Sequence, residues 1–232
     1  MKLDDMTLEP DFFSSAHVAA YPQPNEHLIL RIANLVSAAS DGSMEEDTND
    51  YNEGRTELDS HANMCVVGKN VMVLNKPTRF ANVQAFSPSI EGLSRVPIVD
   101  AAIIYACSFT MQSYTLVIKN ALYVDNMDHN LIPPFVMREA GIKVNERPKI
   151  HSPDPTIDDH SIYIKDHDLR IPLALWGIFS FFPSRKPTNE EAEDDSAVIM
   201  ITPDSPDWNP YSDVYAKNEE SFLDWQGRLI PK

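Results

Sequence analysis

Cysteine is scarce in this chain, and long hydrophobic runs are missing from it. Two cysteines, Cys65 and Cys107, are too few for the disulfide framework typical of small secreted domains. No apolar run reaches the roughly 18 to 20 residues of a membrane-spanning helix. Residues 1–11 are acidic where a signal peptide is basic. We therefore expect a cytoplasmic chain with no membrane partner, in which each cysteine is a small buried apolar residue.

Basic charge is also sparse. The 232 residues contain 35 acidic and 19 basic side chains, for a formal net charge of −16. Residues 1–50 contain 10 acids and 2 bases, residues 151–232 contain 16 acids and 7 bases, and the hundred residues between them contain 9 acids and 10 bases. Because phosphate binding needs clustered Lys and Arg, we expect no nucleic-acid partner for this segment.

This charge distribution predicts three parts: an acidic N-terminal arm over residues 1–52, a folded unit over 53–150 and a C-terminal extension over 151–232. Residues 41–52 are rich in Asp and Glu and predict a hydrated linker, so the acidic flanks are expected to be partly disordered. An amphipathic helix is predicted over residues 26–40, where apolar residues recur at helical spacing after two prolines: Leu28, Ile32, Leu35, Val36 and Ala39.

Apolar and β-branched runs in the central unit predict strands. The runs cover residues 56–58, 64–67, 79–86, 96–106, 114–118 and 121–124, with a bend expected at residues 119–120. A short helix is expected from Pro134, which suits a first helical turn, to Gly141, which suits the left-handed position after a helix end. The predicted fold class is mainly β, with the core between residues 55 and 150.

The C-terminal extension contains two short apolar segments, residues 161–164 and 171–182, which can pair as a hairpin around residues 166–168. We expect Trp176 and the neighbouring phenylalanines to lie against the central unit. Five acids within residues 190–195 predict a solvated linker. The tail from residue 203 is rich in Pro, Asp and Asn, and it either stays loose or docks through Trp208, Tyr211, Phe222 and Trp225.

One stretch places a single carboxylate after a short apolar lead-in and before small residues: Glu57-Leu58-Asp59-Ser60-His61-Ala62-Asn63. We interpret this pattern as a candidate for one half of an aspartic protease active site. Two aspartates held close together share a proton, and the charged member activates a water for attack on a peptide carbonyl. Residues 195–197 have similar letters but follow a run of acids where an apolar strand is needed. The second aspartate is therefore expected from a second copy of the chain.

Three stretches stand in order between residues 53 and 150: ELDSHANMCVVG at 57–68, NALYV at 120–124 and DHNLIPPF at 128–135. In this order they resemble the retropepsin-like protease region of copia-type LTR retrotransposon polyproteins, particularly the diatom-like variety. Two later runs, DLRIPL at 168–173 and FFPSRKP at 181–187, resemble the segment that follows the protease there. The resemblance implies a small closed β-barrel with a flap and a short C-terminal helix, active as a homodimer on its own polyprotein.

By position, the resemblance makes Asp59 the catalytic aspartate and Ser60 the hydroxyl residue that links the two active-site loops across the dimer axis. His61 and Ala62 complete the active-site loop. Retroviral members have Gly at the position of His61, where the missing side chain lets the backbone approach the carboxylate. The polar tip predicted at residues 87–95 is the flap candidate, with Ser87, Pro88, Ile90, Gly92 and Leu93.

One alternative to catalysis remains open at this stage. An Asp-Ser pair in a loop is also a common turn, in which the carboxylate accepts nearby backbone N–H groups. The chain is then a catalytically inactive relic of the same fold, serving as a dimerisation or interaction module. A structural zinc site at His61 and Cys65 is not expected, because four ligands are needed and no paired Cys or His set is near. We expect no cofactor and no metal.

Overall fold

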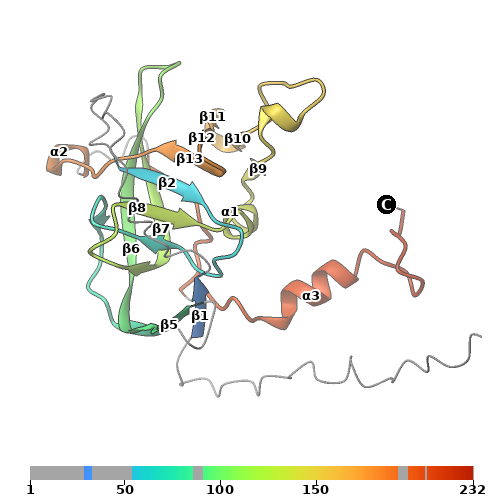
Figure 1. Ribbon diagram of the computed structural model, residues 1–232, viewed down its shortest axis with the longest axis horizontal. Helices are drawn as coiled ribbons and strands as arrows, with labels where there is room; N and C mark the ends of the chain where they lie inside the picture. The colour runs from blue at the N-terminus through green and yellow to red at the C-terminus, as the bar shows by residue number, and fades with distance from the viewer. Residues whose placement is uncertain (1–28, 33–53, 86–90, 193–197, 207, 232) are drawn as a thin grey trace, which may run out of the picture.

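The computed structural model describes residues 29–32, 54–85, 91–192, 198–206 and 208–231. The fold is mainly β, as the sequence predicts (Figure 1). The first half contains β1 (Ile29–Ile32), β2 (Arg55–Leu58), β3 (Val66–Val67), β4 (Met72–Val73), β5 (Arg79–Ala85), β6 (Leu93–Ala106), β7 (Ser113–Tyr123), β8 (His129–Ile132) and α1 (Pro134–Glu139). The second half contains β9 (Lys143–Asn145), η2 (Lys149–His151), β10 (Ser161–Ile164), η3 (Lys165–His167), β11 (Leu169–Pro172), β12 (Ala174–Trp176), β13 (Phe179–Pro183), α2 (Asn189–Ala192), β14 (Val198–Met200) and α3 (Asp213–Glu220).

The main sheet has the strand order β1-β5-β6-β7-β3-β8-β2-β13-β12, with β14 also on β7 and β4 on β6. Within the described residues this path is open, with β1 and β12 at its ends, so the expected closed barrel is not found. The reason is that β13 of the C-terminal extension pairs antiparallel with the outer edge of β2, and β12 pairs with β13. A second sheet has the order β11-β10-β9.

The core is shared between the central unit and the C-terminal extension, which corrects the expectation that it lies within residues 55–150. Phe182 on β13 is fully buried, and its ring meets that of Tyr105 edge-on, with centroids 6.1 Å apart. Ile162 and Ile171 of the second sheet and Ile201 after β14 belong to the same cluster. In the second sheet, Ile162 and Ile164 on β10 and Leu169 and Ile171 on β11 are buried at alternate positions, so these side chains line one face of the sheet.

The predicted N-terminal helix is wrong where the structure describes it. Residues 29–32 form β1, which pairs in parallel with β5, Ile29 opposite Asn82 and Ile32 opposite Ala85. Apolar spacing alone does not distinguish a short helix from a strand. Residues 29–32 form a strand because they pair with the edge of β5. The rest of residues 26–40, and the linker over 41–52, lie outside the described residues.

Other local predictions are confirmed. Helix α1 begins at Pro134, and Gly141 follows its end with φ of +79°. The bend expected at residues 119–120 is a bulge within β7, where Asn120 has φ of +55° and the register with β6 shifts. The hairpin around residues 166–168 is formed by β10 and β11, but most of its predicted second arm, residues 171–182, lies in β12 and β13, which pair with each other in the main sheet. Both cysteines are unpaired and buried.

The linker predicted over residues 190–195 is structured in its described part. Its first residues belong to α2, and the Glu191 carboxylate receives two hydrogen bonds from the Arg185 guanidinium, at 2.6 and 2.7 Å. These bonds, with the amide of Thr188, lower the pKa of Glu191 to about 2. Residues 193–195 lie outside the described residues.

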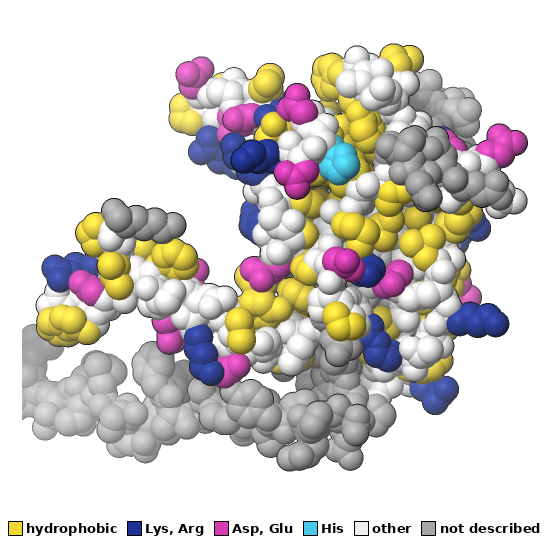
Figure 2. Space-filling view, turned by 180° about the vertical axis from the view of Figure 1, so that it is seen from behind, with side chains coloured by type: hydrophobic (Ala, Val, Ile, Leu, Met, Phe, Trp, Pro, Cys, Tyr) yellow, Lys and Arg dark blue, Asp and Glu magenta, His cyan; other side chains and the backbone are white. Residues whose placement is uncertain are grey.

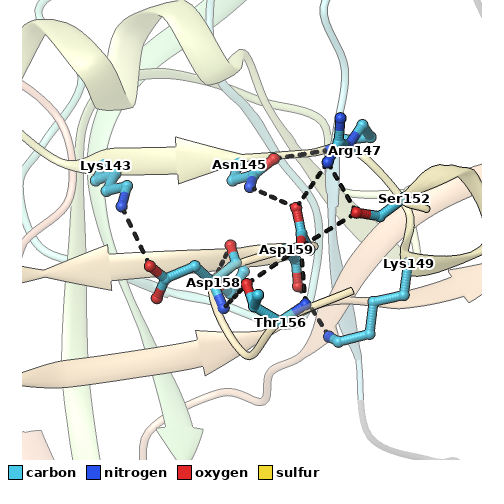
Figure 3. A network of polar contacts seen from close by, with 9 residues as sticks. Lys143, Asn145, Arg147, Lys149, Ser152, Thr156, Asp158 and Asp159 are labelled. Atoms are coloured by element: carbon cyan, nitrogen blue, oxygen red, sulfur yellow. Dashed lines mark hydrogen bonds and ion pairs between the residues drawn. The ribbon is translucent and has the colours of Figure 1, made fainter. Parts of the chain in front are cut away.

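A polar network holds the connection between β9 and β10 (Figure 3). The buried Asp159 carboxylate accepts hydrogen bonds from the Thr156 amide at 2.9 Å and from Asn145 and Arg147 at 3.3 Å. The Lys149 ammonium donates to the Asp159 carbonyl at 2.8 Å. Led by the Thr156 amide, these donors lower the pKa of Asp159 to about 2, so the network stays ionised in mild acid.

No helix in the described parts of the chain combines the length and the apolar character needed to cross a membrane.

Candidate active site

Strand β2 delivers Asp59 to the end of a buried strand pair. Strands β2 and β8 are parallel, with Leu58 opposite Ile132, and the Asp59 amide donates to the Ile132 carbonyl at 3.1 Å. On its other side, β8 pairs antiparallel with β3. The connection from β2 to β3, residues 59–65, therefore crosses the end of β8 (Figure 1). This crossing places Asp59 at the carboxyl ends of two parallel strands.

The four residues predicted for the active-site loop lie together in one turn. The Asp59 Oδ1 atom accepts the His61 amide at 2.9 Å, so the turn's own backbone orients the carboxylate. Asp59 is partly exposed, Ser60 and His61 are exposed, and Ala62 is buried. The Ser60 Oγ and His61 Nδ1 atoms lie 3.4 Å apart. The loop therefore has an accessible carboxylate, hydroxyl and imidazole on Asp59, Ser60 and His61, while Ala62 lies in the core.

A buried polar chain supports this loop from below, and sequence reasoning missed it. The Thr56 hydroxyl lies 2.8 Å from the hydroxyl of Ser184, the residue directly after β13, and accepts from the Asn130 amide at 3.2 Å. The Asn130 Oδ1 atom in turn accepts from the Gly68 amide at 3.0 Å. These contacts connect β2, β8, β13 and the end of β3. The available signal was the polar residues Thr56 within β2 and Asn130 within β8, whose partners are identified only once the strands are aligned.

Gly68 permits this arrangement through close approach. A Cβ atom at this position would lie 2.2 Å from the Met127 carbonyl oxygen, well inside any allowed contact. The Lys69 amide donates to the same carbonyl at 2.9 Å. A side chain at residue 68 would therefore separate β3 from the turn that leads into β8.

A charged group lies on β2 and β8, towards the strand ends opposite the loop. The buried Glu57 carboxylate pairs with Arg55 at 2.6 Å and faces the His129 imidazole at 3.9 Å. The Arg55 guanidinium lies 3.8 Å from the centroid of the Trp176 ring, which attaches β12 to β2 by a cation–π contact. Burial lowers the pKa of His129, against the attraction of the Glu57 carboxylate.

The C-terminal extension reaches the same loop. The Trp208 Nε1 atom donates to the Asn63 carbonyl oxygen at 2.8 Å, and the Asn63 side-chain amide donates to the Tyr211 hydroxyl at 3.1 Å. The tail from residue 203 was predicted either to stay loose or to dock through aromatic residues. At Trp208 and Tyr211 it docks, and the residue that it contacts is four positions after Asp59.

The flap candidates belong to the hairpin of β5 and β6, which pair antiparallel. Leu93 is the first residue of β6, opposite Val83, and its side chain is exposed. A Cβ atom on Gly92 would lie 2.2 Å from the Val83 carbonyl oxygen, so glycine allows the two strands to meet there. Ser87, Pro88 and Ile90 lie outside the described residues.

In the described parts of the chain, no three His, Cys, Asp or Glu side chains gather around a common point. Burial raises the pKa of the Cys65 thiol to about 12, so this group is neutral near pH 7. His61 and Cys65 also face different surroundings, one exposed and the other in the core. Asp195, the weaker second aspartate motif, lies outside the described residues.

No family model matches the chain, and the comparisons with curated proteins and with solved structures find no match either. What the arrangement can do chemically is therefore argued from its own geometry. A partly exposed carboxylate, fixed by a backbone amide above a buried strand pair, is suited to act as a general base or general acid.

Proposed function

We propose that the chain is a retropepsin-like aspartic endopeptidase of a copia-type LTR retroelement, which acts as a homodimer on its own polyprotein. The observation that carries the proposal is the position of Asp59 at the ends of parallel β2 and β8, with Oδ1 fixed by the His61 amide. In this reading Asp59 of each copy supplies one carboxylate of the pair. The pair shares one proton, and its ionised member removes a proton from the attacking water.

The fold supports this reading in its order of elements. Strand β2, the Asp59 loop, β3, the β5–β6 hairpin, β7, β8 and α1 follow one another as the retropepsin-like resemblance implies. We propose that this is a retropepsin-like sheet whose β2 edge is completed by β13 of the C-terminal extension. The two buried, unpaired cysteines favour a reducing, cytoplasmic setting.

The test is cleavage of peptides that span the chain's own linkers, residues 41–52 and 187–197, between pH 4 and pH 6. Asp59→Asn should abolish cleavage, because the amide cannot share the proton, while sedimentation still shows the same dimer. Asp125→Asn is the matched control, since this aspartate is exposed and lies away from the loop. Activity should rise faster than in proportion to protein concentration in the dilute range. Full activity of Asp59→Asn, or of a monomer, would refute the proposal.

One observation favours the second candidate, an inactive interaction module. The His61 side chain occupies a position where retroviral relatives have no side chain, and its Nδ1 atom lies 3.4 Å from the Ser60 hydroxyl that would reach the second copy. If wild type and His61→Gly are both silent between pH 4 and pH 6 while both form dimers, the interaction module is the better reading.

A further inference from the structure

The segment after β14 is fixed to the sheet before it reaches the active-site loop. Strand β14 pairs in parallel with β7, and the Ile201 amide continues this pairing to the Val117 carbonyl at 3.0 Å. The Thr202 hydroxyl then accepts the Lys119 amide at 2.7 Å, and the Ser205 carbonyl accepts the Asn120 side-chain amide at 3.0 Å. The path of residues 198–205 is therefore set by the edge of β7.

Trp208 joins this segment to both halves of the core. Its indole packs against the cluster around Leu116 and Phe182 and also against the cluster around Val66 and Leu122. From this position Nε1 reaches the Asn63 carbonyl, and Tyr211 reaches the Asn63 side chain. Asn63 is thus held through its main chain and its side chain by residues nearly 150 positions later in sequence.

Two further rings complete the contact. The Trp208 ring lies 5.6 Å from that of Tyr215 and 6.4 Å from that of Phe135 on α1, and Phe135 and Tyr215 meet edge-on at 5.2 Å. Such ring pairs contribute roughly 0.5–1.5 kcal/mol each beyond the area that they bury. We name Trp208, Tyr211 and Tyr215 the C-terminal clasp. The part of α3 after Tyr215 and the residues that follow it extend away from the two sheets (Figures 1 and 2).

The clasp and β8 hold the active-site loop at its two ends. The Ile132 carbonyl of β8 fixes the Asp59 amide. The clasp fixes Asn63 and rests on Phe135 of α1, the helix that follows β8 directly. Between these two attachments Ser60 and His61 are exposed. The orientation of this exposed turn therefore depends on the position of both ends.

We propose that the C-terminal clasp positions the Asp59 loop, with Trp208 and Tyr211 as positioning residues that act through Asn63. The effect of this positioning on catalysis rests on the proposed function. If Asp59 is the reacting carboxylate, a displacement of about 1 Å can lower the reaction rate roughly a hundredfold. The C-terminal extension is then part of the active unit, and a chain cut before Trp208 keeps Asp59 but lacks one support of its loop.

The first test is amide hydrogen exchange of residues 60–64 in the full chain, which reports on the loop whether or not the protein cleaves peptides. Trp208→Phe keeps a ring for stacking and removes the Nε1 donor. Tyr211→Phe removes one hydroxyl from an exposed side chain. Each should accelerate exchange of the loop amides roughly 2- to 10-fold, the ratio expected for one hydrogen bond. Trp225→Phe is the matched control, because that indole lies on the extending arm and is 89 % exposed.

Unchanged loop exchange in both Trp208→Phe and Tyr211→Phe, or an equal acceleration in Trp225→Phe, would overturn the proposal. The second test uses peptide cleavage: both clasp variants should lower kcat more than they change KM, with thermal unfolding of Tyr211→Phe unaltered. A rise in KM alone would assign the clasp to substrate binding and refute positioning. If wild type cleaves nothing, the proposed function fails, and hydrogen exchange still decides the clasp.

Discussion

Phe182→Ala should destabilise the whole protein, although Phe182 lies beyond the central unit. The side chain is fully buried on β13, opposite Thr56 of β2, and its ring meets Tyr105 of β6. Removing a buried phenylalanine ring from a packed core costs about 3–5 kcal/mol, from lost burial and from the cavity left behind. Native domains are stable by only about 5–15 kcal/mol. The variant therefore loses a large share of the total.

The assay is urea unfolding followed by two probes. All three tryptophans, Trp176, Trp208 and Trp225, lie in the C-terminal extension, so their fluorescence reports on that part. Far-ultraviolet circular dichroism reports on the sheets. If both parts form one cooperative unit, the two transitions coincide and move together in Phe182→Ala. Phe179→Ala is the matched control on the same strand, because Phe179 is 37 % exposed and should cost roughly 1 kcal/mol or less.

Two results would contradict this reasoning. One is a loss in Phe182→Ala no larger than in Phe179→Ala. The other is a pair of separate transitions in which only the fluorescence change moves, since that would make residues 151–232 a domain of their own. Phe182→Leu provides a graded check, because it removes fewer buried atoms and should therefore cost less than Phe182→Ala.

Three further substitutions test the contact at Gly68, the ion pair of Arg185 with Glu191, and the side chain of Asn63. Gly68→Ala should lower the free energy of unfolding by about 1–3 kcal/mol, because its Cβ would lie 2.2 Å from the Met127 carbonyl oxygen. An unchanged urea midpoint would contradict this, since it would mean that β3 can shift to accommodate the Cβ at no cost in stability. Arg185→Gln should destabilise the protein more at pH 7 than at pH 2. The Glu191 pKa is lowered from 4.5 to about 2 in the folded protein, so the stability that its ionised form adds is fully present above pH 4.5 and is lost as the pH falls through about 2. An equal loss at the two pH values would contradict this prediction. Asn63→Ala should accelerate loop exchange less than Trp208→Phe, because the Asn63 Oδ1 atom is buried with no hydrogen-bond donor among the described residues and its removal relieves a penalty. The reverse order would mean that the Asn63 side chain, not its carbonyl, holds the loop.

Local sequence patterns predicted the elements around Asp59 well. β-branched and apolar runs predicted β5, β6 and β7, and Pro134 with Gly141 predicted the ends of α1, because these signals act within a few residues. The turn that brings Ser60, His61 and Ala62 beside Asp59 was likewise expected from the motif itself.

The partners of these elements could not be predicted in the same way. Pairing of β13 with β2 depends on which sheet edge remains available after folding, and no local pattern records this. The pairing of β1 with β5 could not be predicted either, because the apolar spacing of residues 26–40 also fits a helix and no local pattern indicates that the edge of β5 is available. The hydrogen bonds that connect Thr56 with Asn130 and Ser184 beneath the Asp59 loop can be identified only after β2, β8 and the end of β13 are aligned.

The pairing of β13 with β2 also has a consequence for the order of events on the ribosome. The strand that leads into Asp59 is complete at Leu58, but its neighbour β13 ends at Pro183. At about 5–20 residues per second, the intervening ~125 residues take roughly 6–25 s to synthesise. Until then β2 has one open edge, and Trp208 emerges later still. The Asp59 loop therefore lacks β13 and Trp208 until residue 208 has been synthesised, and under the proposed function this delays cutting by the nascent chain.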